Sequence, residues 1–153
     1  MDDGTCWGLI DLLDWRHDGD DERVLKPLVD RLASMADAEI GSFHEILAQK
    51  LYELDGRAWA RESGPDIWWG DRDRLSVDGF LYSRSAVVAR GRTIYDAVRA
   101  DPTRMPKNAG FETLLYVAAN AYERKTGLEF DELDDTELSY ETFSNEAGWP
   151  DDA

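Results

Sequence analysis

Cysteine, histidine and long apolar runs are scarce in this sequence. Cys6 is the single cysteine, so no intramolecular disulfide can form. That favours a reducing compartment and predicts a cytoplasmic protein. The longest apolar run covers residues 114–119. Because a bilayer-spanning helix needs about 20 apolar residues, we expect no association with a membrane through such a helix.

Positive charge is also in short supply. The chain has 17 Lys and Arg against 33 Asp and Glu, a net charge of −16. Phosphate backbones and anionic membrane surfaces attract cationic faces, so this charge disfavours nucleic acid and membranes as partners. The charge is uneven: residues 129–153 contain ten carboxylates and no Lys or Arg, whereas residues 57–107 carry ten basic and seven acidic side chains. We therefore expect the acidic end to fold onto the basic middle, or one of the two to face a partner.

Signatures of catalysis and of metal binding are missing as well. The sequence has no nucleophile elbow, phosphate-binding loop or dinucleotide-binding glycine pattern. The histidines, His17 and His44, do not stand in the Glu-x-x-His spacing of a di-iron bundle. Cys6 near a helix start is more typical of a packed side chain than of a nucleophile. We expect no catalytic residue, no metal and no cofactor.

Apolar residues recur at helical spacing along most of the chain. The pattern predicts helices near residues 5–13, 20–32, 37–54, 78–99 with a break at Gly91, and 108–126, and a short helical turn at 57–62. Strand-like alternation is absent. The prediction is an all-α compact bundle of about five to seven helices with an acidic C-terminal extension. Residues 1–128 would form the bundle domain. Residues 129–153 would be a tail, either strapped onto the bundle through its bulky apolar side chains or a disordered interaction segment.

Trp68-Trp69-Gly70 is the most unusual local feature, since it lies in a predicted loop over residues 63–77. Large aromatic residues are over-represented at binding hot spots, although one tryptophan plugging the bundle end would be a purely structural explanation. The flanking arginines would suit an anionic ligand or the acidic tail. The candidate binding residues are Arg57, Trp59, Arg61, Trp68, Trp69, Asp78, Tyr82 and Arg84.

A series of short segments in a fixed order resembles a widespread, mostly bacterial family catalogued as domain of unknown function 4240. The likeness runs over most of residues 5–127. It is carried by Trp7-Gly-Leu9-Ile10-Asp11, Leu51-Tyr52 before Asp55, Asp78-Gly-Phe80-Leu-Tyr82-Ser-Arg84, Gly91-Arg92, Tyr95-Asp-Ala97, Ala100-Asp101-Pro102, Phe111-Glu112, Leu115-Tyr116-Val-Ala118 and Tyr122. The resemblance implies an all-α fold and a cytosolic bacterial protein, with no agreed reaction.

The charge pattern and the missing catalytic set favour a non-enzymatic interaction or regulatory module that binds another protein. The alternative is a small-molecule-binding protein or an unrecognised enzyme with a pocket near residues 57–84. The sequence does not indicate the oligomeric state.

Overall fold

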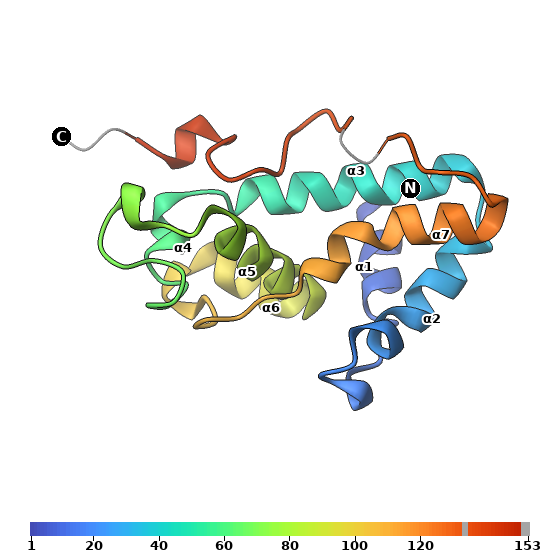
Figure 1. Ribbon diagram of the computed structural model, residues 1–153, viewed down its shortest axis with the longest axis horizontal. Coiled ribbons are helices and arrows are strands. Elements are labelled where there is room, and N and C mark those ends of the chain that lie inside the picture. The colour runs from blue at the N-terminus through green and yellow to red at the C-terminus, as the bar shows by residue number, and fades with distance from the viewer. Residues whose placement is uncertain (133–134, 151–153) are drawn as a thin grey trace. The chain divides into compact units, whose positions relative to one another are not determined.

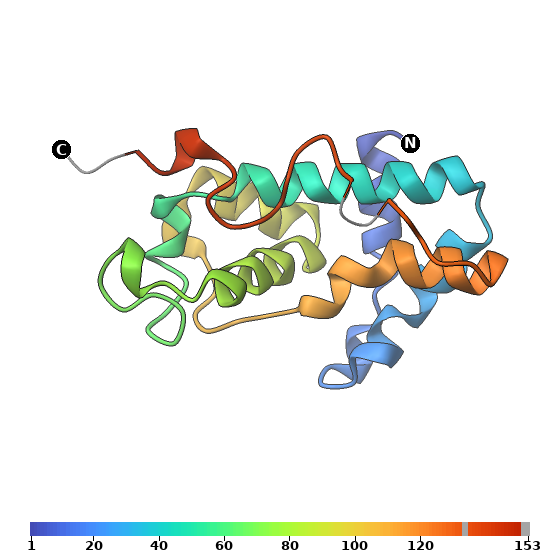
Figure 2. The ribbon, with the colours of Figure 1, turned by 45° about the horizontal axis from the view of Figure 1, so that its top comes forward.

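Local side-chain caps explain where several helices begin. The computed structural model describes residues 1–132 and 135–150, and these form seven α-helices, five short 3-10 turns and no strand (Figures 1 and 2). Asp2, Asp20 and Ser76 each accept a hydrogen bond from a backbone N–H in the first turn of α1 (Asp3–Ile10), α2 (Asp21–Ala33) and α5 (Val77–Ala89). Such caps satisfy donors that the helix itself leaves free. The expected all-α fold is confirmed.

The chain packs as two units. Among the described residues, the first unit contains 1–48, 113–132 and 135–137, and the second contains 49–112 and 138–150. In the first unit, α2 packs against α1 and against α7 (Val117–Thr126). The core of this unit is apolar because α2 and the first part of α3 (Asp37–Glu53) each present one apolar face. It includes Val24, Leu28, Leu32, Ile40, Phe43, Leu114, Val117 and Ala121.

The second unit holds the end of α3, α4 (Arg57–Ala60), α5 and α6 (Arg92–Ala100). Helices α5 and α6 pack on each other after a sharp turn at Gly91, whose φ of 96° suits glycine. Residues 138–150, which include the 3-10 turn Glu146–Gly148, also belong to this unit. The core includes Leu51, Leu54, Ala60, Phe80, Leu81, Val87, Val88, Tyr95 and Val98. The division of the chain at residue 128 stays a prediction.

Two helices begin later or earlier than the sequence pattern indicates. Helix α5 is capped by Ser76 rather than by Asp78, and α7 begins at Val117 rather than near residue 108. Asn108 has a positive φ of 51°, and the 3-10 turn Glu112–Tyr116 precedes α7. In the part of the chain that the structure describes, no helix is both long and apolar enough to cross a membrane.

Candidate functional site

The loop of residues 63–77 is fixed by its own backbone. The Trp69 N–H donates to the Arg74 carbonyl over 3.1 Å, and the Ser76 N–H donates to the Ile67 carbonyl over 2.8 Å. Between them, Trp68 and Leu75 form an isolated antiparallel bridge. The loop is therefore closed like a short hairpin. Trp68 is half-buried, whereas Trp69 is 52% exposed.

The base of the loop is anchored to residues 107 and 108. The Asn108 N–H donates to the Ser63 carbonyl over 2.8 Å, and the Asn108 side-chain oxygen accepts from the Asp66 N–H over 2.9 Å. Lys107 pairs with the Glu62 carboxylate at 3.0 Å. Because both ends are bonded, the exposed Trp69 ring stands on an ordered support.

The other expected site residues divide between surface and interior, although all lie in the second unit. Arg61 and Asp78 are exposed, and Arg57 and Tyr82 are half-buried. The half-buried Trp59 donates its indole N–H to the Val98 carbonyl over 2.9 Å, which ties α4 to α6. These positions leave Trp69, Arg61 and Asp78 as the members of the predicted set that a partner could contact directly.

Arg84 is completely buried and serves the fold. Its guanidinium donates to the Leu51 carbonyl over 2.8 Å, the Tyr140 carbonyl over 3.0 Å and the Thr142 hydroxyl oxygen over 3.0 Å. It also stacks over the Phe80 ring at 4.8 Å. Burial lowers the pKa of Arg84 to about 10, opposed by the nearby carboxylates of Asp55 and Glu141.

Asp55 is the acidic counterpart of Arg84 and is likewise fully buried. One carboxylate oxygen accepts from the Phe143 N–H over 3.2 Å and from the Trp149 indole N–H over 2.8 Å. The other accepts from the Asn145 N–H over 2.9 Å. A carboxylate that takes three N–H donors in a buried place is well compensated for its lost hydration.

Two glycines allow the backbones at this place to touch. A Cβ on Gly148 would overlap the Asp55 carbonyl oxygen and lie 2.9 Å from the Gly56 Cα. We call the surface formed by Leu51, Asp55, Gly56, Val77 and Arg84 the Asp55–Arg84 seat, and residues 138–150 the C-terminal segment. Figures 1 and 2 show this segment in red beside the end of α3 and α5.

Sequence reasoning missed most of the seat. The sequence predicts Arg84 as a candidate binding residue, and Asp55 belongs only to the segments that carry the family resemblance. Thr142, Asn145 and Trp149 were not singled out as site residues. Asp55-Gly56 after an apolar helix and Gly148-Trp149 near the end of the chain look like ordinary turn residues.

Two grooves open on the first unit. The larger, of about 670 Å³, has a mixed apolar, polar and charged lining, made of Glu22, Leu25, Lys26, Val29, Thr113, Tyr116, Asn120 and Arg124. The smaller, of about 530 Å³, is strongly acidic and is lined by Asp37, Ala38, Gly41, Ser42, Glu45, Tyr122, Phe130 and the carboxylates Glu129, Asp131 and Glu132. Among the described residues, no three His, Cys, Asp or Glu side chains are grouped as metal ligands.

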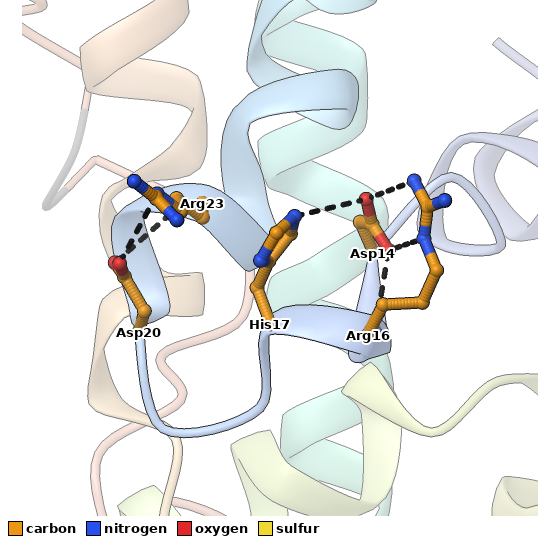
Figure 3. Close-up of polar contacts among 5 residues, drawn as sticks. All are labelled: Asp14, Arg16, His17, Asp20 and Arg23. Carbon is orange, nitrogen blue, oxygen red and sulfur yellow. Dashed lines mark hydrogen bonds and ion pairs between the residues drawn. The ribbon is translucent and has the colours of Figure 1, made fainter.

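His17 lies in a cluster whose contacts are local (Figure 3). Asp14 accepts hydrogen bonds from the Arg16 backbone N–H over 3.2 Å and from its guanidinium over 2.8 and 2.7 Å. The Arg16 guanidinium holds the pKa of Asp14 at about 2. His17 Nε2 is 3.7 Å from the Asp14 carboxylate, and Asp20 pairs with Arg23 in the first turn of α2. These pairs close two successive turns of the chain, so Asp14 and Asp20 have a local structural role.

Comparison with known proteins places the chain in a family but assigns it no activity. Searches of curated proteins and of solved structures gave no significant match. A family model described as "Protein of unknown function (DUF4240)" matches residues 1–124, in agreement with the resemblance carried by the ordered segments above. The chain belongs to this family.

Proposed function

We propose that this protein is a non-enzymatic interaction module that binds another protein through the loop of residues 63–77. The observation that carries the proposal is the 52% exposure of Trp69 on a loop closed by backbone hydrogen bonds. Tryptophan is the residue type most enriched at interface hot spots. A pre-ordered loop also loses little conformational entropy when a partner binds.

The charged residues in the stretch that contains Trp69 indicate which kind of partner would fit. Residues 57–78 contain four arginines and five acids, so this region is nearly neutral. Arg61, Arg74 and Asp78 are exposed and supply both signs of charge within this stretch of the chain. The fitting partner is a protein with an apolar pocket for one indole ring and a mixed polar rim. The net charge of −16 argues against nucleic acid.

A matched pair of aromatic substitutions tests the proposal. The partner is first captured with the full-length chain and then purified, and its affinity for three chains is measured by calorimetry. Trp69→Ala should weaken binding by about 30-fold or more, the effect of losing a hot-spot residue of about 2 kcal/mol. Tyr116→Ala removes an aromatic side chain that is 42% exposed on the first unit and should leave the affinity within about threefold. Equal affinities for all three chains would exclude the loop as the binding surface.

Small-molecule binding is the second proposal, and the larger groove on the first unit supports it. Its volume of about 670 Å³ lies in the range of ligand pockets. This groove is lined by α2, the 3-10 turn Glu112–Tyr116 and α7, and not by residues 57–84, where the sequence pattern predicts a pocket. A compound-library screen by thermal shift decides the matter. A hit that Asn120→Trp abolishes would support the groove, whereas hits insensitive to this substitution would count against it.

We also propose that the protein works in the bacterial cytoplasm. The proposal rests on the family resemblance and on Cys6, which is the single cysteine and is buried. Fractionation of cells that carry the native gene would contradict it if the protein appeared outside the cytosolic fraction.

A further inference from the structure

The C-terminal segment is bound to the rest of the second unit as a peptide is bound to a receptor. It has no α-helix or strand, and a 3-10 turn at Glu146–Gly148 is its only regular element. Its described bonds to the seat run from its backbone and from a few side chains to Asp55, Arg84 and helix-end carbonyls. Recognition through main-chain groups plus a few inserted side chains is typical of peptide-binding sites.

Arg84 and Asp55 bind different groups of the C-terminal segment. Arg84 binds the Tyr140 carbonyl and the Thr142 hydroxyl, and that hydroxyl donates in turn to the Val77 carbonyl over 2.8 Å. Asp55 then binds the Asn145 N–H and, farther along the segment, the Trp149 indole N–H. The Trp149 ring also contacts Phe80 edge-on, with centroids 6.0 Å apart. The spacing of a threonine and a tryptophan seven residues later therefore matches two buried charges on the receptor side.

The close approach of Gly148 to Gly56 adds a steric filter. The backbone of Gly148 does not adopt a positive φ, so its conformation does not require glycine. The reason for glycine is space, because any side chain there would overlap the backbone of Asp55. Ala147, the preceding residue, is exposed. A bound peptide must therefore have glycine at the position of Gly148, whereas the position of Ala147 accepts other residues.

Seat and segment are separable along the chain. Asp55 and Arg84 lie within residues 1–124, which the family model matches, whereas the segment lies beyond them. The residues that lead into the segment, up to Glu137, belong to the first unit. In the segment, the side chains of Tyr140, Thr142 and Trp149 are the buried ones.

We propose that the Asp55–Arg84 seat is a peptide-binding site, filled in cis by residues 138–150, and that the same segment of a second copy of this chain can occupy it in trans. The second copy is the occupant that the structure supports, because its segment carries the threonine, the glycine and the tryptophan that the seat binds. Exchange of an identical element between copies restores the same contacts within the seat, which makes it a low-cost route to a dimer. The cis segment has the advantage of a high effective concentration, so exchange becomes visible when the connection is cut.

The test uses the full-length chain with a protease recognition sequence inserted after Asp135, which is exposed. Normal and ¹⁵N-labelled chains are cleaved separately, mixed and examined by native mass spectrometry. We expect the C-terminal fragment to stay bound after cleavage, and hybrid light–heavy complexes to appear on mixing. Loss of the fragment during gel filtration, absence of hybrids, or loss of the circular dichroism of the helices on cleavage would each overturn the proposal.

Peptide variants then test whether the seat recognises the segment specifically. A fluorescent peptide of residues 138–150 should bind the cleaved chain, compete with the resident fragment and bind the uncleaved chain much more weakly. With Gly148→Ala in the peptide we expect binding weaker by about 10- to 100-fold, the usual effect of overpacking at a buried contact. Ala147→Ser is the matched control and should bind within about threefold. Equal binding of both variants would mean that the peptide attaches elsewhere, and the assignment of the seat would fail.

Discussion

Replacing Asp55 by asparagine is the sharpest single perturbation of the second unit. The substitution preserves shape and volume but removes the charge and one acceptor oxygen. In the native protein, one oxygen serves the Phe143 N–H and the Trp149 indole, and the other serves the Asn145 N–H at 2.9 Å. An asparagine oriented to keep the first two bonds turns its NH₂ group toward the Asn145 N–H, so that two donors face each other.

The magnitude follows from these three bonds. A buried donor left without an acceptor costs about 1–3 kcal/mol, and each bond that changes from charge-assisted to neutral loses about 1 kcal/mol. The sum is roughly 3–5 kcal/mol in the free energy of unfolding. This loss is large against the ~5–15 kcal/mol that typically stabilises a domain. We therefore expect Asp55→Asn to detach the C-terminal segment before it unfolds the helices.

Two measurements check this expectation. Urea unfolding followed by circular dichroism gives the global loss, and hydrogen exchange at the Phe143 and Asn145 amides reports the segment itself. Asp66→Asn is the control, because the Asp66 side chain is exposed in the same unit, and it should change stability by no more than about 0.5 kcal/mol. A loss below about 1 kcal/mol for Asp55→Asn, with amide protection unchanged, would refute the argument that the buried carboxylate secures the segment.

Further substitutions probe the surroundings of the seat. Arg84→Met should lower the free energy of unfolding by about 3–5 kcal/mol and speed up amide exchange in residues 140–142, because three buried acceptors lose their donor and Asp55 keeps a buried charge. Burial lowers the pKa of Arg84 to about 10 and so opposes its charge, but the three bonds outweigh this effect; a loss below about 1 kcal/mol in urea unfolding would contradict the expectation. Burial, with the charge of Glu53, raises the pKa of the Tyr95 hydroxyl, so its contribution is present below the unfolded pKa of 10.0 and is lost as pH rises above it. Stability measured from pH 9 to 11 should fall more steeply for the native protein than for Tyr95→Phe, and parallel curves would refute that assignment. Trp59→Phe removes the indole bond to Val98 and should cost about 1–2 kcal/mol in thermal unfolding, with no loss counting against a tie between α4 and α6.

The order of the helices could be predicted from the sequence because it depends on local patterns. The apolar stripe of residues 40–54 predicts α3, and Asp20 marks the predicted start of α2. Gly91 predicts the break between α5 and α6. Each of these signals acts within one or two turns of its own helix. The family assignment also followed from the sequence, because it needed only the order of short segments and no geometry.

The predicted starts of α5 and α7 are wrong because these starts depend on contacts with residues outside each helix. Residues 108–111 have good helical residues after them, but the N–H groups of Asn108 and Phe111 are taken by the carbonyls of Ser63 and Tyr82. These bonds hold the backbone in a non-helical path: Asn108 has a positive φ of 51° and residues 112–116 form a 3-10 turn, so α7 begins only at Val117. Ser76 and Asp78 are both good N-cap residues. The bridge between Trp68 and Leu75 holds the strand-like end of the loop up to Leu75, and it is Ser76 that caps α5.

The candidate site was harder to predict, since composition shows how many charges there are and not which of them are buried. The sequence predicts Arg84 only as a candidate binding residue, and the neighbouring residues give no sign that its charge is buried. Its acceptors, Leu51 and Tyr140, are separated from it by 33 and 56 residues. The partners of Asp55 lie 88 to 94 residues away and are backbone and indole N–H groups, which leave no pattern in a sequence.

The burial of Asp55 and Arg84 changes the expected way in which the acidic C-terminal region is attached. From composition, attraction between exposed carboxylates and a basic middle would attach this region, and salt would weaken such attachment. In the described C-terminal segment, Glu141 and Glu146 are exposed, while the bonds to the rest of the unit are made by carbonyl, hydroxyl, amide and indole groups with Asp55 and Arg84. Bonds in a buried place are little screened by ions. Attachment of the segment therefore depends on one buried carboxylate and one buried guanidinium rather than on its exposed acids.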